Sequence, residues 1–179
     1  MPVDHEFGAQ HTELKLSIVE SYLKAFVTAL TPHFKELWYI DAFAGTGAIG
    51  LEALSRGAAA AVFIEQDREA LAILRKNIDA LRERPRTQIV PGDATRPPRA
   101  TSSCAVAFLD PPYRSGLAAS ALAALRAAGW LAQEALAVVE IGAREELAPP
   151  AGFTLLDERV YGAARLVFLR HQHTVGDAR

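Results

Sequence analysis

Apolar residues recur along the chain in two alternating patterns, which predict helices and strands in turn. Over residues 12–30 they return every three or four positions, the spacing of an amphipathic helix, and Thr31-Pro32 ends this helix because the residue before a proline disfavours helix. Short apolar runs between turn residues then predict strands. The expected strands are residues 37–42, 60–65, 88–90, 104–109, 135–141, 153–160 and 165–169. The expected later helices are residues 48–56, a helix capped by Asp67 with Leu71, Leu74, Ile78 and Leu81 on its apolar face, and residues 117–128.

Strands alternate with helices through the fifth strand, and the last two strands follow each other without a helix. The first arrangement indicates a parallel sheet with helices on both faces, and the second indicates an antiparallel hairpin at one edge. The expected fold is α/β: a Rossmann-like, doubly wound, mostly parallel seven-stranded sheet with an antiparallel C-terminal hairpin, preceded by an N-terminal helix. We expect an N-terminal arm and helix at residues 1–36, the main domain at 37–171 and a loose C-terminal tail from about residue 171 to 179.

Composition narrows the classes of protein that fit. The net charge is −2, so the chain lacks the overall basic excess of a protein that grips nucleic acid unaided. Cys104 is the only cysteine, which excludes a disulfide framework and a cysteine-rich metal site and predicts a small buried side chain rather than a nucleophile. We find neither a signal-peptide pattern nor an apolar run long enough to span a membrane, and the histidines are scattered. We therefore expect a soluble cytoplasmic protein without a metal.

The first expected strand of this domain leads into Gly45, Gly47 and Gly50, a strand–turn–helix context typical of nucleotide-type ligand sites. Acidic residues stand at the ends of four strands, and ligands of open parallel sheets bind at that edge. A carboxylate 20 residues after the first glycine can accept from both hydroxyls of a ribose. The loop itself suits either a pyrophosphate, as in NAD enzymes, or a zwitterionic amino acid. The four acids are Asp41 beside a ligand ammonium, Glu65 at the ribose, Asp93 at an adenine amino group and Asp110.

The turn at residues 110–113, Asp-Pro-Pro-Tyr, indicates the chemistry. Two prolines stiffen the backbone and remove N–H donors. The Asp110 carboxylate and the Pro111 carbonyl can then hold an exocyclic amino group and fix the direction of its nitrogen lone pair. Tyr113 can stack on a flat base, as enzymes that act on extruded bases commonly do.

These motifs resemble the class I S-adenosylmethionine-dependent methyltransferases, in the order Asp41-Ala-Phe-Ala-Gly-Thr-Gly47, Glu65, Gly92-Asp-Ala94 and Asp110-Pro-Pro-Tyr113. Residues 43–57, 108–113, 129–132 and 138–140 are similar to the RsmD family, which methylates the exocyclic N2 of a guanine in small-subunit ribosomal RNA. The resemblance covers about residues 37–170. It implies catalytic roles for Asp110, Pro111, Pro112 and Tyr113, and cofactor binding by Asp41, Phe43, Gly45, Gly47, Glu65, Gln66, Asp93, Ala94 and Asp110.

The same resemblance implies S-adenosylmethionine as cofactor and 16S ribosomal RNA or the assembled small subunit as partner, met by a monomer in a bacterial cytoplasm. Residues 1–36 depart from it, because they lack the basic Arg-Pro-Thr-type segment of RsmD proteins. They resemble the start of the three-Cys-motif partner proteins instead. Five arginines could meet phosphates, although loop arginines are more often simply solvated: Arg82, Arg84, Arg86, Arg96 and Arg99.

Three other functions compete with this hypothesis. The turn at residues 110–113 would equally serve an adenine N6 or another amino group of nucleic acid or protein. A non-catalytic partner that keeps the cofactor fold is a second alternative, which the intact turn disfavours. A short-chain NAD dehydrogenase is a third, but none of the four tyrosines has a lysine four residues later, as that class requires.

Overall fold

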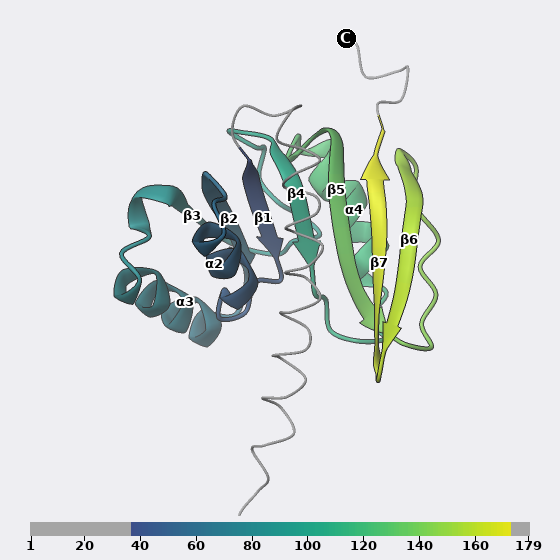
Figure 1. Cartoon of the computed structure of the whole chain (residues 1–179), viewed down its shortest axis with the longest axis horizontal. Coiled ribbons are helices and arrows are strands. Elements are labelled where there is room, and N and C mark those ends of the chain that lie inside the picture. The colour runs from purple at the N-terminus through teal and green to yellow at the C-terminus, as the bar shows by residue number, and fades with distance from the viewer. Residues whose placement is uncertain (1–36, 173–179) are drawn as a thin grey trace, which may run out of the picture. The chain divides into compact units, whose positions relative to one another are not determined.

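The computed structural model describes residues 37–172, which form a single seven-stranded sheet flanked by helices (Figure 1). The chain divides into two compact units, Met1–Lys35 and Glu36–Arg179, and only the second contains described residues. The helix expected at residues 12–30 lies outside the described part. The strands are β1 Trp38–Ala42, β2 Ala60–Glu65, β3 Thr87–Pro91, β4 Cys104–Leu109, β5 Leu131–Gly142, β6 Phe153–Tyr161 and β7 Ala164–His171. The helices are α2 Ala48–Ser55, α3 Arg68–Ala80, α4 Leu117–Ala127 and the 3-10 helix Arg84–Arg86.

The strand order is β3-β2-β1-β4-β5-β7-β6. The first five strands in this order pair in parallel, whereas β7 runs antiparallel to both β5 and β6. The chain reverses its direction of winding between β3 and β4, because β4 returns to the other side of β1. This arrangement confirms the expected Rossmann-like α/β fold, and it puts the crevice between β1 and β4, where such sheets bind ligands.

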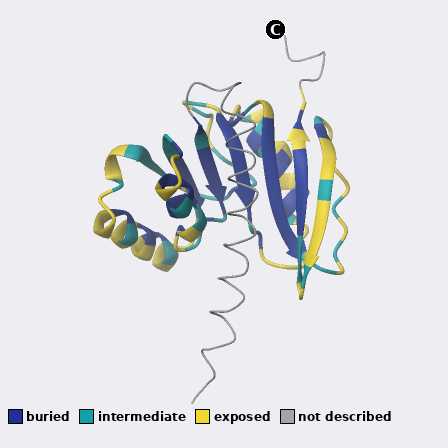
Figure 2. Cartoon of the chain, viewed as in Figure 1, coloured by how far each residue is buried: buried dark blue, intermediate teal, exposed yellow. Residues whose placement is uncertain are grey.

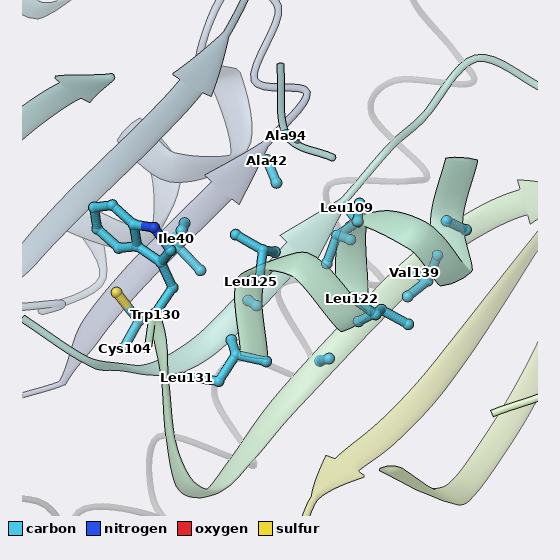
Figure 3. Close-up of a cluster of buried hydrophobic side chains, with 14 of the residues drawn as sticks. Ile40, Ala42, Ala94, Cys104, Leu109, Leu122, Leu125, Trp130, Leu131 and Val139 are labelled. Atoms are coloured by element: carbon cyan, nitrogen blue, oxygen red, sulfur yellow. The ribbon is translucent and has the colours of Figure 1, made fainter. Parts of the chain in front are cut away.

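Helices cover both faces of the sheet, as the alternation of side chains along β2 shows. Val62 belongs to the buried cluster that includes Leu122 and Leu125 of α4. The next residue, Phe63, points to the other face, where its ring lies against Gly50 of α2. Figure 3 shows Leu122 and Leu125 of α4 among the strand side chains of this first cluster. The central strands are accordingly buried on both faces, while much of β6 is exposed (Figure 2).

Most boundaries lie within two residues of those the sequence predicts, and three of the differences change the place of individual residues. Leu81 is 58% exposed because α3 ends at Ala80, so this leucine lies beyond the helix and not on its core face. Strand β5 begins at Leu131 and not at residue 135. It includes the polar Glu134 although this residue adopts a left-handed φ of 62° and the register with β4 shifts between Cys104 and Val106. His171 is no part of a loose tail: it is buried at the end of β7, with Nδ1 2.7 Å from the carbonyl oxygen of Ala132.

The prediction that Cys104 is a small buried side chain is confirmed. Cys104 opens β4 and is fully buried, and burial raises the pKa of its thiol to about 12, so it stays protonated and unreactive. Trp130 lies in the core with its indole N–H donating to the carbonyl of Pro98 at 2.8 Å. Among residues 37–172, no helix has the length and apolar character needed to cross a membrane.

Candidate active site

The sheet topology brings the four strand-end acids to one edge. Residue 42 of β1 is in register with Ile64 of β2 and with Leu109 of β4. Glu65, the last residue of β2, and Asp110, the residue after β4, therefore lie at the same edge on either side of β1. Asp93 follows the end of β3, which is in register with the end of β2. The gathering that the sequence predicts is therefore present, and the site is built at the carboxyl ends of β3, β2, β1 and β4.

The three glycines after β1 serve different physical purposes. Gly47 and Gly50 are packing glycines: a Cβ on either would come within 2.3 Å of a buried side chain, Leu74 for Gly47 and Phe63 for Gly50. Gly45 has a φ of 52° and faces open space, with no atom within 4 Å of where its Cβ would lie. It is thus the glycine that leaves room for a ligand at close range to the backbone. Phe43 also holds a left-handed φ of 65°, a strained conformation that is common at functional sites.

Side chains from two other elements fix this glycine loop, defined here as residues 43–47. The N–H of Gly45 donates to Glu65 Oε2 at 2.7 Å, and Glu65 Oε1 accepts from the backbone N–H groups of Gln66 and Asp67. Asn77 of α3 donates from Nδ2 to the carbonyl of Thr46 at 3.0 Å. Glu65 is therefore already oriented, and since a carboxylate has about four acceptor positions it retains capacity for ligand hydroxyls. The sequence gives no signal for the role of Asn77. It lies 31 residues after Thr46, and the periodicity of its helix is equally consistent with a solvent-exposed side chain.

Asp41 and Asp93 are also held by local hydrogen bonds. Asp41 is buried, and its Oδ2 accepts from the N–H of Gly50 at 3.1 Å, which ties β1 to the start of α2. Asp93 Oδ1 accepts from the N–H and the hydroxyl of Thr95, both at 2.8 Å. These hydrogen bonds, the backbone one first, lower the pKa of Asp93, so this carboxylate is ionised at neutral pH. The preceding Gly92, like Gly45, faces open space.

These residues fit a nucleoside cofactor. The open spaces at Gly45 and Gly92 flank Glu65, an oriented carboxylate, and Asp93, an ionised one. Acceptors spaced along one sheet edge suit ribose hydroxyls and an exocyclic amine, while the absence of Cβ atoms permits close contact.

The Asp-Pro-Pro-Tyr turn (residues 110–113) begins directly beside this loop. The N–H of Asp110 donates to the carbonyl of Ala42, at the end of β1, at 3.4 Å. Pro111 is buried, whereas the carbonyl of Pro112 accepts from Ser115 and closes the turn. The Pro112 carbonyl is thus already used within the turn, which favours the Pro111 carbonyl as the acceptor for substrate.

Two glutamates in and after β5 position the turn. The hydroxyl of Tyr113 donates to Oε1 of the buried Glu140 at 2.7 Å. Glu145 Oε1 accepts from the N–H of Arg114 at 2.7 Å and from that of Gly142 at 3.2 Å, which supports a left-handed φ of 59° at Arg114. Burial, then the hydrogen bond and charge of Glu140, raise the pKa of Tyr113, so its hydroxyl stays a donor. In the sequence, Glu140 could have been noticed as a single charged residue within an apolar strand. Glu145 has no comparable sequence signal.

Tyr113→Phe is expected to lower the free energy of unfolding by about 1–2 kcal/mol, because Glu140 Oε1 loses a charge-assisted hydrogen bond while the ring remains. Chemical denaturation at neutral pH measures this change. Tyr161→Phe is the matched control, since its hydroxyl has no hydrogen bond to a described residue. Equal stability of the wild type and Tyr113→Phe would show that the hydrogen bond contributes nothing.

Comparison with known proteins now adds to this geometry. The family model described as "Conserved hypothetical protein 95" matches residues 20–170. The chain belongs to this family. It is 37% identical over 134 residues to "Ribosomal RNA small subunit methyltransferase D" of Escherichia coli, covering 74% of this chain and 68% of the relative, and 34% identical over 137 residues to the protein of that name from Haemophilus influenzae, covering 74% and 71%.

Solved structures agree with the family. A Haemophilus influenzae protein superposes with a TM-score of 0.75 at 28% identity, covering 87% of this chain and 99% of that one. The yhhF protein of Escherichia coli superposes with a TM-score of 0.69 at 33% identity, covering 83% of each. The resemblance to the RsmD family is thus confirmed, and the chain is a methyltransferase of this family. These relatives give no support to the resemblance of residues 1–36 to three-Cys-motif partner proteins, and that segment lies outside the described residues.

Proposed function

We propose that the protein transfers a methyl group from S-adenosylmethionine to the exocyclic N2 of a guanine in small-subunit ribosomal RNA. The observation that carries this proposal is the junction of β1 and β4. There the Asp-Pro-Pro-Tyr turn starts from a hydrogen bond to the last residue of β1, whose next residues form the glycine loop. A turn able to hold an amine thus adjoins a loop able to hold the donor.

The cofactor side is assigned to residues 41–47, 65–66, 93–94 and 110. S-adenosylmethionine, when bound, supplies an activated methyl group on a sulfonium. Glu65 accepts from the ribose hydroxyls, Asp93 from the adenine amino group, and the N–H of Ala94 meets the ring. Asp41 supplies negative charge near the ammonium, while Phe43 and Gln66 border the nucleoside and Gly45 and Gly47 shape the loop. The family membership and the open space at Gly45 and Gly92 support these roles.

On the substrate side, the chain's contribution is positioning. Asp110 and the Pro111 carbonyl accept from the two hydrogens of the exocyclic amine and aim its nitrogen lone pair at the methyl carbon. As the nitrogen forms its bond to the methyl carbon, the bond between that carbon and the sulfonium sulfur would break, and the proton that the amine loses would pass to the Asp110 carboxylate. Tyr113 is 48% exposed although Glu140 anchors its hydroxyl, which supports stacking of the base on its ring. Pro112 keeps the turn stiff.

The name of the E. coli and H. influenzae relatives, ribosomal RNA small subunit methyltransferase D, supports ribosomal RNA as the substrate. The test incubates the protein with labelled S-adenosylmethionine and either naked 16S ribosomal RNA or assembled small subunits that lack the modification. Products are digested to nucleosides and the labelled position is mapped. We expect label in N2-methylguanosine at a single position.

The two RNA substrates, naked 16S ribosomal RNA and assembled small subunits, distinguish this proposal from its alternatives. Transfer to assembled subunits alone would define the particle as the substrate, and label in N6-methyladenosine would replace guanine by adenine. No transfer to either RNA would overturn the proposal. Heat stabilisation by S-adenosylhomocysteine but not by NAD is the cofactor control, because a ligand that binds only the native state raises its stability.

A further inference from the structure

A cavity of about 670 Å³ lies beside the Asp-Pro-Pro-Tyr turn, on the side towards β6 and β7. Its lining comes from three segments that are distant in sequence: the end of the turn, the chain after β5, and the β6–β7 turn. The lining residues are Tyr113, Arg114, Gly142, Ala143, Arg144, Glu145, Gly162 and Ala163. The cavity therefore adjoins the exposed ring of Tyr113, where the target base would stack.

Hydrogen bonds make the walls of this cavity rigid. The N–H of Ala143 donates to the carbonyl of Ala163 at 2.8 Å, which joins the chain after β5 to the β6–β7 turn. Arg165 donates from a guanidinium N–H to the carbonyl of Ala143 at 2.8 Å. Glu145 Oε1 joins the third wall by accepting from Arg114 and Gly142. The shape is thus already formed without a ligand, which lowers the entropy cost of binding.

Two guanidinium groups at this cavity are not used within the described structure. Arg114 and Arg144 are exposed, and their side chains make no hydrogen bond or ion pair with any residue from 37 to 172. Many other arginines differ: Arg84 pairs with Asp79 and Arg86 with Glu83. Arg84 and Arg86 are two of the five arginines that the sequence suggested for phosphate contact, and both are already paired with carboxylates. The Glu145 carboxylate lies in the same wall, but its Oε1 is occupied by two backbone N–H groups.

We propose that this cavity receives the nucleotides next to the target base, with Arg114 and Arg144 binding their phosphates. The inference rests on the proposed function and deepens it by naming the substrate contacts. Unpaired guanidinium groups suit phosphate oxygens, and an aromatic ring with adjacent cations is the usual recognition surface for an unstacked single strand. The left-handed φ of Arg114, held by Glu145, fixes the direction in which its side chain leaves the turn.

The test measures binding of the full chain to a single-stranded RNA oligonucleotide by fluorescence anisotropy, at several salt concentrations. We expect Arg114→Ala and Arg144→Ala each to weaken binding by roughly tenfold and to reduce the slope of log K against log salt by about 0.7, the value for one lost phosphate contact on a single strand. Arg144→Lys should restore the slope because it keeps the charge. Affinity for S-adenosylhomocysteine, measured in parallel, should not change.

Arg75→Ala is the matched control. Arg75 is exposed on α3, which lies near the β3 edge of the sheet, whereas β6 and β7 form the opposite edge (Figure 1). Unchanged RNA affinity and salt slope in both cavity variants, or an equal effect of Arg75→Ala, would overturn the inference. The inference would also be overturned if a polyglutamate peptide bound in place of RNA with the same dependence on the two arginines. Methyl transfer is scored separately, so a wild type that binds RNA through these arginines yet modifies none would refute the proposed function alone.

Discussion

Asp110→Ala is expected to reduce methyl transfer by about 100- to 1,000-fold, while affinity for S-adenosylhomocysteine falls far less, because Asp110 is only one of the residues assigned to the cofactor. The loss follows from geometry: without this carboxylate the exocyclic amine keeps one acceptor, and a poorly oriented nucleophile loses about this factor. Asp110 itself is fixed by the hydrogen bond from its N–H to the carbonyl of Ala42, which the substitution leaves in place. Single-turnover rates and calorimetric titration measure the two quantities.

Two variants sharpen this result. Asp110→Asn keeps one acceptor oxygen and should lose less activity than Asp110→Ala. Glu69→Ala removes an exposed carboxylate from the first turn of α3 and should leave transfer unchanged. Near wild-type transfer by Asp110→Ala would refute the catalytic assignment, and a parallel loss of S-adenosylhomocysteine binding would instead make Asp110 mainly a cofactor residue.

The largest effect on stability is expected from Gly50→Ala, a substitution that a helix would normally favour. The added Cβ would lie 2.3 Å from Cε1 and 2.8 Å from Cζ of Phe63, a fully buried residue of β2. Overpacking typically costs about 1–3 kcal/mol and occasionally more. An overlap at 2.3 Å with a fully buried ring puts this variant at or above the upper end of that range, well beyond the gain of roughly 1 kcal/mol in helix propensity. The free energy of unfolding should therefore fall, as denaturant titration can measure.

The mechanism makes a further demand that a double mutant can test. If the clash with Phe63 is the cause, Gly50→Ala should cost less in a Phe63→Leu background than in the wild type, because residues in contact are not additive. Gly45→Ala is the contrasting variant: it meets no atom within 4 Å, so it should lose cofactor affinity rather than fold stability beyond about 1–2 kcal/mol of backbone strain. Additive effects of Gly50→Ala and Phe63→Leu would rule out the steric explanation.

Local patterns were sufficient to predict most of the elements, and the failures have physical causes. The runs at β2 and β4 were predicted with their observed bounds because buried parallel strands are apolar without interruption. The beginning of β5 was missed because Glu134 is part of the strand despite its polarity and its left-handed φ. Leu81 was assigned to the core face because periodicity does not reveal where a helix ends.

The sequence by itself determined the order of strands and helices, the glycine loop and the row of acids at the strand ends. It did so because these features depend on neighbouring residues and on the rule that open parallel sheets bind ligands at their carboxyl edge. Only the tertiary structure decided which glycine leaves open space, that Asn77, Glu140 and Glu145 hold the loop and the turn, and that Arg84 and Arg86 are paired. The partners of Asn77, Glu140 and Glu145 lie 27 to 31 residues away in sequence, and contacts between such distant segments depend on packing that no local pattern records. The pairs Arg84–Asp79 and Arg86–Glu83 are close in sequence, but they depend on the turn that the chain makes after α3 ends, which periodicity does not reveal.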